Sequence, residues 1–416
     1  MIKKISIAVC LLLSVVSFAQ QGTASPYSYY GIGDVRYKGT AEIRSMAGIA
    51  VEQDSIHLNM DNPASYANLK LTTFAVGGSY LTTKMKNASV TENARRTAID
   101  YLAVGLPMGK LGVGFGLIPY SSVGYQIESL NTIDGGSNSR YDGNGGLNKA
   151  FLGAAYKISP KFSFGADVHY NFGKIETSGL VFVTDVPVGT RELSTANLSG
   201  VDYSIGAMYQ TKISKKISFF SSVSYKMESN LTSNNTSSIS AVNYNANFNF
   251  TTVDSEDEIT DKKILKLPSK LSVGAGFGEA RKWMIGAQAV LGSVGDLVNT
   301  YNQSNDVSYE KSMKYSLGGY YVPNYNSFTN YAKRIVYRAG LKYDKTGLMV
   351  KSESINDIGF TLGLGLPITG TFSNVNFGFE MGKRGTTSAG LIQENYANFS
   401  IGLSLNDRWF EKRKFQ

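Results

Sequence analysis

The sequence predicts an all-β protein, a transmembrane antiparallel β-barrel of about 14 strands. From about residue 70 onward, large apolar residues alternate with small or polar ones, as in LGVGFGL at 111–117, and a period of two is the signature of β-strands. The composition agrees, because 44 Gly, 26 Tyr and 21 Phe in 416 residues do not suit a helical membrane protein. The loops between the expected strands alternate between short and long, which is typical of outer-membrane barrels.

The N-terminus predicts export. Two lysines precede an apolar core that ends in SFA at 17–19, the pattern of a secretory signal peptide over residues 1–19 that is cleaved before Gln20. A lipoprotein anchor on Cys10 is rejected, because Cys10 lies inside the apolar core. The mature chain then contains no cysteine and relies on no disulfides. Beyond this segment, no apolar run reaches the ~20 residues that a transmembrane helix needs.

Fourteen strands are expected within residues 70–407, with centres near 76, 102, 115, 153, 167, 205, 222, 273, 287, 317, 339, 362, 378 and 402. The connections after the even-numbered strands are mostly tight: PMGK at 107–110, SPK at 159–161, SKK at 214–216, EAR at 279–281, PITG at 367–370 and the longer VPNYNSFTN at 322–330. The other connections are longer or more polar, such as 131–146 and the Asn/Ser-rich tract at 230–261. A soluble sandwich has no reason to sort its loops by side.

Lipid offers the backbone no hydrogen-bond partners, so a sheet spans a membrane only when it closes into a barrel. The Phe, Leu, Ile and Val faces are therefore expected to face lipid, and Gly, Ser, Thr and Asn to face inward. We expect the barrel to lie in the outer membrane, in contact with lipid and lipopolysaccharide. The short turns, both termini and a basic tail at 408–416 are expected on the periplasmic side.

The segment before the first strand, residues 20–69, lacks sustained alternation and carries Asn62-Pro63-Ala64 just ahead of the barrel. This NPA segment before a Gly-rich, fourteen-stranded barrel resembles the FadL/TodX family of outer-membrane channels for hydrophobic compounds. The opening SPYSYYGIGD and the ending LSLNDRWFEKRKF are similar to the version of that family found in Bacteroidota. The resemblance implies that residues 20–69 fold into the lumen as a hatch. Inward glycines on the third, twelfth and thirteenth strands leave room for such a plug.

Pro119 lies partway along the third expected strand, where proline cannot donate to the ladder. The resemblance implies that this strand is kinked inward and opens a lateral gap through which an apolar solute reaches the membrane. The candidate gate residues are Pro119, Tyr120, Ser121, Ser122 and Gly124. The alternative is that the strand simply ends just past the bilayer.

Ionisable residues on inward phases form a second candidate group: Asp167, His169, Arg338 and Glu380. Either they form a charge network in the lumen, or they are solvated or tie a plug in place. The acidic cluster at 254–261 lacks the spacing of a known calcium loop and is interpreted as an exposed loop. We therefore expect no metal site and no cofactor.

Catalysis finds little support, because the two histidines lie in different elements, no G-x-S-x-G follows a strand and the mature chain has no thiol. The formal net charge of +9 is not gathered into a basic run with aromatics, so nucleic acid is not an expected partner. Two functions remain. One is a channel for passive uptake of hydrophobic small molecules such as fatty acids. The other is a non-transporting, FadL-like accessory subunit of a machine for outer-membrane protein export or insertion.

Overall fold

The computed structural model describes residues 23–37, 39–87, 89–131, 136–183, 186–245, 248–297 and 306–409. The expected signal peptide and most of the expected basic tail lie outside these residues. Within them, the chain forms one antiparallel sheet that closes on itself through β1 and β18, from Thr72↔Asp407 to Lys86↔Gln393. No helix among the described residues combines the length and apolar character that a membrane span needs.

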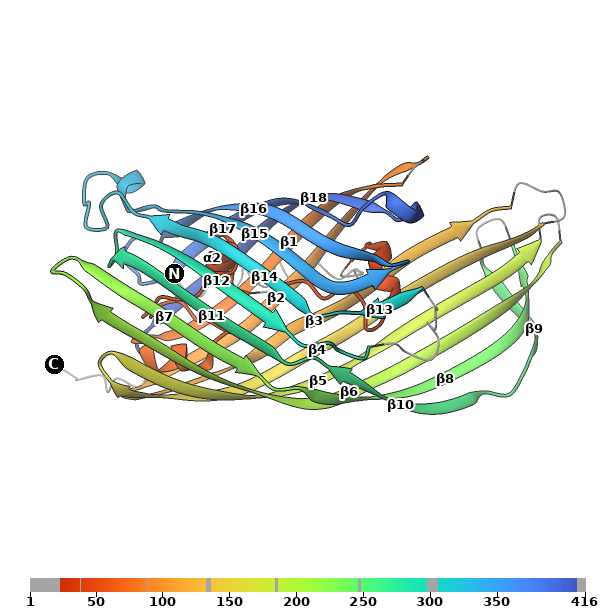
Figure 1. The fold of residues 1–416 in the computed structure, drawn as a ribbon, viewed down its shortest axis with the longest axis horizontal. Coiled ribbons are helices and arrows are strands. Elements are labelled where there is room, and N and C mark those ends of the chain that lie inside the picture. The colour runs from red at the N-terminus through yellow and green to blue at the C-terminus, as the bar shows by residue number, and fades with distance from the viewer. Residues whose placement is uncertain are drawn as a thin grey trace.

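The strands follow one another around the barrel in chain order (Figure 1). Their bounds are β1 (Thr72–Lys86), β2 (Thr91–Met108), β3 (Leu111–Ser129), β4 (Ser137–Ser159), β5 (Phe162–Val183), β6 (Val188–Lys212), β7 (Ile217–Lys226), β8 (Ser229–Tyr244), β9 (Phe250–Ser255), β10 (Ile259–Leu267), β11 (Lys270–Glu279), β12 (Trp283–Gly292), β13 (Val307–Tyr309), β14 (Ser312–Tyr321), β15 (Val336–Val350), β16 (Glu353–Pro367), β17 (Asn374–Arg384) and β18 (Gln393–Asp407).

These segments make fourteen strands of the wall, because three strands are interrupted. β7 and β8 lie end to end along β6. β9, β10 and β11 follow one another along β8 and β7. β13 precedes β14 along β15. Pro268, which has no N–H to donate, lies at the break between β10 and β11. The prediction of a fourteen-stranded antiparallel barrel is confirmed.

The alternation along each strand separates two faces as expected. On β5, Phe164, Val168 and Tyr170 are exposed on the outer surface, whereas Ser163 and Asp167 are buried inside. Short connections at 109–110, 160–161, 213–216, 280–282 and 368–373 join strands at one end of the barrel. The connection at 322–335 is longer and contains η4 (Tyr331–Arg334).

The wall is uneven in height. β4, β5 and β6 contain 23, 22 and 25 residues, whereas β12 and β14 contain only 10 each. Figure 1 shows these long strands, together with β8, extending past the rest of the barrel at the end opposite the short connections. The barrel is therefore taller on the side formed by β3 to β10.

Candidate functional site

The N-terminal segment (residues 23–71) lies inside the barrel, where Figure 1 shows its short helices surrounded by strands. It contains the short helices η1 (Pro26–Tyr29), α2 (Ala41–Arg44) and η2 (Pro63–Asn68). A further 3-10 helix, η5 (Ser388–Gly390), lies in the connection between β17 and β18. Its apolar residues pack on several sides of the inner wall: Leu58 and Leu69 beside Phe151, and Ile49 and Val51 beside Phe220. The segment therefore fills the lumen between opposite strands. Whether it moves as a hatch stays a prediction.

The NPA motif anchors this segment to the wall. Asn62 caps η2 by accepting a hydrogen bond from the Ala64 N–H at 3.0 Å, and Pro63 occupies the first position of η2, where its missing N–H costs nothing. The Asn62 amide also donates to the carbonyls of Ala207 and Val223 and to the Ser222 hydroxyl, at 2.9–3.2 Å. One asparagine thus joins the start of η2 to β6 and β7.

Glycines mark the places where the segment touches the wall. A Cβ at Gly165 would lie 2.6 Å from the Pro63 carbonyl carbon, and one at Gly340 would lie 2.6 Å from that of Met46. A Cβ at Gly112 would meet the Tyr66 carbonyl. These distances are shorter than real Cβ atoms adopt, so only glycine fits where the segment's backbone lies against the strands.

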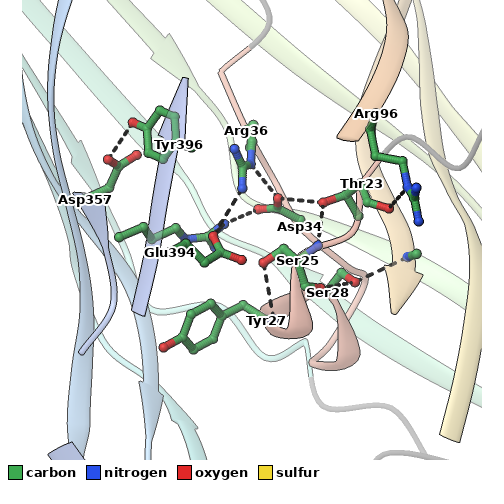
Figure 2. A network of polar contacts seen from close by, with 12 residues as sticks. Thr23, Ser25, Tyr27, Ser28, Asp34, Arg36, Arg96, Asp357, Glu394 and Tyr396 are labelled. Carbon is green, nitrogen blue, oxygen red and sulfur yellow. Dashed lines mark hydrogen bonds and ion pairs between the residues drawn. The ribbon is translucent and has the colours of Figure 1, made fainter. Parts of the chain in front are cut away.

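Figure 2 shows a polar cluster that joins residues near η1 to the wall. Asp34 is buried and forms ion pairs with Arg384 of β17 and with Arg36, both at 2.6 Å, while Arg36 also reaches Glu394 of β18 at 3.3 Å. Burial alone would raise the pKa of Asp34, but the charges of Arg36 and Arg384 hold it well below its usual value. The Thr23 carbonyl accepts a hydrogen bond from Arg96 of β2 at 3.2 Å.

A second buried ion pair secures α2. Arg44 donates to the Asp100 carboxylate of β2 at 2.7 Å and lies 3.8 Å from Glu380 of β17. The Ala41 N–H donates to the Tyr101 hydroxyl at 3.1 Å. The short helix is therefore held from two strands that are far apart in the sequence.

The four predicted lumenal charges are all inward, but they do not form one network. Asp167 accepts a hydrogen bond from Tyr66 of η2 at 3.2 Å and lies 3.7 Å from the His169 Nε2 atom. His169 in turn contacts Asp202 through Nδ1 at 2.5 Å. In the described part of the chain, no group of three His, Cys, Asp or Glu side chains could hold a metal ion.

Arg338 and Glu380 lie at two other places. Arg338 donates to the Asn376 side chain at 2.9 Å. Glu380 is 2.6 Å from the Lys342 ammonium, which also contacts Asp357 at 3.1 Å. Asp167 and Glu380 each contact the N-terminal segment, which supports the interpretation that such charges tie a plug in place.

The predicted gate residues lie where the barrel wall comes apart. β2 and β3 pair only from Leu102↔Leu117 to Met108↔Leu111. Above Leu117, β3 pairs with β4 alone, and β2 above Leu102 pairs with β1 alone. We call this wedge the β2–β3 seam, bounded by residues 91–101 of β2 and 118–129 of β3.

Both strands are irregular at the base of the seam. A register shift between Pro119 and Ser121 makes Tyr120 a bulge. On β2, the pairing with β1 passes from Tyr101 directly to Ile99, so Asp100 is also bulged. In the β2–β3 register, in which 102 faces 117, position 100 would face Pro119.

The N-terminal segment covers the lower part of the seam. The Asp34 N–H donates to the Ser122 carbonyl at 2.8 Å, and the Ser122 N–H donates to Asp34 at 3.1 Å, which forms an isolated antiparallel bridge. The Ser121 hydroxyl donates to the Ile32 carbonyl at 2.6 Å, and the Gly124 N–H donates to Ser28 at 3.2 Å. The Tyr120 ring instead faces the ammonium groups of two lysines, Lys149 at 4.7 Å and Lys226 at 4.9 Å.

A cavity of about 1030 Å³ adjoins the upper part of the seam. Its lining combines residues 92–96 of β2 and 124–126 of β3 with outer parts of β4, β5 and β6. Its charged lining residues carry both signs: four are basic (Arg95, Arg96, Arg140 and Arg191) and three are acidic (Glu92, Asp142 and Glu176). The lining of the cavity is therefore mainly polar rather than apolar.

Sequence reasoning missed the wall residues that hold the segment, above all Asp100, Arg384 and Glu394. In the sequence these residues can be noticed only as charged side chains at inward-facing positions of a strand. The sequence does not indicate with which charged residue of the N-terminal segment each one forms an ion pair. The seam was signalled by Pro119, but the bulge at Asp100 was not.

Comparison with known proteins adds a family and a fold. A protein-family model described as BamG matches residues 1–416. No curated protein matches the chain. Among solved structures, the chain is similar to the toluene transporter TbuX of Ralstonia pickettii, with 15% identity over 88% of this chain and 98% of that chain and a TM-score of 0.58.

The toluene transporter TodX of Pseudomonas putida is similar at 14% identity, over 89% of this chain and 98% of that one, with a TM-score of 0.58. A Pseudomonas aeruginosa FadL homologue is similar at 10% identity, over 90% and 99%, with a TM-score of 0.61. At such identities the likeness establishes the fold, and the predicted resemblance to FadL-like outer-membrane barrels is confirmed. These proteins are named as transporters or as a FadL homologue.

Proposed function

The chain belongs to the BamG family, and we propose that it is a non-transporting outer-membrane barrel that serves as an accessory subunit of a machine for outer-membrane protein export or insertion. The observation that carries this proposal is how the segment in the lumen is held, because buried ion pairs as well as apolar packing join it to the wall. Residues 23–71 contact strands all around the inner wall, so a solute has to displace them to pass. The match to the BamG family is compatible with an outer-membrane protein partner.

The cost of displacing the segment supports a structural role for it. Breaking a buried ion pair by removing one partner costs roughly 3–5 kcal/mol, because the remaining charge is left uncompensated. The segment carries two such links to the wall, Arg44–Asp100 and Asp34–Arg384. The Asn62 side-chain NH2, whose two hydrogens are shared among three acceptors on β6 and β7, adds to them.

Polarity also favours a partner over an oily solute. The contacts of the segment include carboxylates, guanidinium groups and amides, and the cavity at the seam is lined by four arginines and three acidic residues. Pockets for apolar ligands are lined mainly by hydrophobic and aromatic side chains with few polar groups. An apolar compound would gain little here.

A channel for passive uptake of hydrophobic molecules with a lateral exit at β3 remains the second candidate. The break of the β2–β3 ladder beyond Leu117 favours it, as does the fold that the chain shares with toluene transporters. On β3 itself, however, the outward face turns polar after Pro119, at Gln126 and Glu128. The residues from Leu111 to Pro119 nearly match the ~9–11 that a strand needs to cross a bilayer, so the break lies near the edge of the apolar band.

Two measurements on the same cells separate the candidates. The full-length tagged protein is purified in mild detergent, and its bound proteins and lipids are identified by mass spectrometry; uptake of a hydrophobic probe is measured before and after depletion of the protein. The proposal expects a stoichiometric outer-membrane protein partner and unchanged uptake. A protein that purifies alone, with uptake that falls on depletion, would identify a channel instead.

A further inference from the structure

The β2–β3 seam presents a free strand edge. Ser122 forms both bonds of its bridge with Asp34 on the side away from β4. Because the backbone groups of a strand point to alternate sides, those of Gly124, Gln126 and Glu128 point to the same side as those of Ser122. The Gly124 N–H is taken by Ser28, but among the described residues Gln126 and Glu128 have no backbone partner on that side.

The protein itself shows that this edge accepts a strand. Asp34 occupies one rung of β3 as an isolated antiparallel bridge, and the residues before it leave the ladder and form η1, whose Ser28 hydroxyl accepts from the Gly124 N–H. The next rungs open into the cavity of about 1030 Å³, which is lined by residues 124–126 on one side and 92–96 on the other. An exposed row of unpaired N–H and C=O groups is a template for another chain.

We propose that the β2–β3 seam is a docking site for an extended segment of a partner protein, which adds to β3 as an antiparallel strand beyond Asp34. This inference rests on the proposed function and names where the partner binds. Main-chain hydrogen bonds to residues 126 and 128 supply affinity, as in other cases of strand addition, and the lining side chains select the sequence.

The chemistry of the lining favours a polypeptide over lipid. Gln126 and Glu128 are exposed, and the cavity wall carries four guanidinium groups against three carboxylates. A lipid chain cannot use the alternating donors and acceptors of a strand edge, whereas a peptide backbone matches them. With Glu128, which pairs with Arg140 at 2.9 Å, the site carries four charges of each sign, so the partner segment is matched by its main chain rather than by net charge.

Site-specific photo-cross-linking in the native membrane tests the proposal. A photoreactive amino acid is placed at Gln126 or at Glu128 of the full-length protein, with Phe164 on the outer face of β5 as the control position. The expected products join both positions to one segment of one partner, at residues two apart and in reversed order. Phe164 should not reach that segment. Cross-links only to lipid, or to protein without this two-residue spacing, would overturn the proposal.

A pair of substitutions separates backbone pairing from side-chain contact. Gln126→Pro removes the N–H that a partner carbonyl would accept, and an edge strand tolerates proline there; Gln126→Ala keeps the N–H. Loss of one hydrogen bond corresponds to about 2- to 10-fold weaker retention of the partner. We expect this loss with Gln126→Pro and near-normal retention with Gln126→Ala, each in a correctly assembled barrel that still shifts its mobility on heating.

Equal losses with both variants would contradict strand addition, and if the proline variant fails to assemble, the spacing of the cross-links decides. If a partner purifies with the protein but cross-links elsewhere, the proposed function stands and the seam proposal falls. If no partner purifies, the proposed function itself fails.

Discussion

Gly165 offers the sharpest test of how the N-terminal segment is held, because it lies directly against the NPA motif. A Cβ at this position would be 2.6 Å from the Pro63 carbonyl carbon and 2.7 Å from both the Ala64 nitrogen and the Pro63 oxygen. Real Cβ atoms essentially never approach another heavy atom closer than 3.0 Å. To reach that distance, the backbone at Pro63 and Gly165 has to separate by about 0.4 Å. Asn62 resists this movement through its bonds to β6 and β7.

The expected magnitude follows from two opposing effects. Overpacking costs roughly 1–3 kcal/mol, whereas replacing Gly by Ala in a strand gains about 0.5–1 kcal/mol. We therefore expect Gly165→Ala to destabilise the seating of η2 by roughly 1–2 kcal/mol, which corresponds to about a 5- to 30-fold larger open population. Gly179→Ala on the same strand is the matched control, since its Cβ meets only ring carbons of Tyr141 at 3.3 Å.

Hydrogen exchange of the amides at 62–69 measures the effect, because Ser65 and Leu69 donate to carbonyls within this segment. Exchange should accelerate in Gly165→Ala and stay at the wild-type rate in Gly179→Ala, while both barrels keep their heat-modifiable mobility. Wild-type exchange in Gly165→Ala would refute the close contact between η2 and β5. Equal acceleration in both variants would mean that alanine disturbs the strand rather than the contact.

Three further predictions address charge, lipid and pH. Arg44→Met leaves Asp100 buried without its partner, so the free energy that seats the segment should fall by roughly 3–5 kcal/mol, measured as protease sensitivity of the N-terminal segment. Phe377→Arg turns a charge toward lipid and should cost ~2–4 kcal/mol of barrel stability near the midplane, measured by urea unfolding in liposomes against Phe377→Leu. Burial and the charge of Asp54 raise the pKa of Glu52 from 4.5 to about 7. A carboxyl group whose pKa is higher in the folded than in the unfolded state stabilises the fold at pH values below its unfolded pKa, and this stabilisation is lost as the pH rises through the folded pKa of about 7. Protection of the amides of residues 50–57 from hydrogen exchange should therefore decline from pH 5 to pH 8. Glu52→Gln should flatten this decline.

Much of the wall could be predicted from the sequence because a barrel in lipid repeats one local rule. The period of two fixes which side chains face outward, and the short connections fix which strands are neighbours, so all fourteen strands and the outward phase of β5 follow from local patterns. Interruptions such as that at Pro268 do not change the count, because the two halves continue along the same neighbours.

The contents of the lumen could not be predicted in the same way. Residues 23–71 have no regular period, and their contacts join positions hundreds of residues apart, such as Asp34 with Arg384. The sequence also suggests that an inward glycine leaves free space, so Gly378→Ser should be nearly silent. In the structure a Cβ at Gly378 would lie 2.9 Å from the Ser45 hydroxyl, and the lumen there is already full.

Pro119 alone does not explain the open seam, and this changes what its replacement should do. If the β2–β3 register continued, position 100 of β2 would face Pro119. Asp100 is bulged, however, and its carboxylate is bound to Arg44 inside the barrel. Pro119→Ala restores one donor, worth ~0.5–1.5 kcal/mol, while the opposing strand stays bent by a buried ion pair. We therefore expect the amides of residues 118–122 to exchange as in the wild type, so that the seam stays open. Strong new protection there in Pro119→Ala would show that proline is the sole cause of the break.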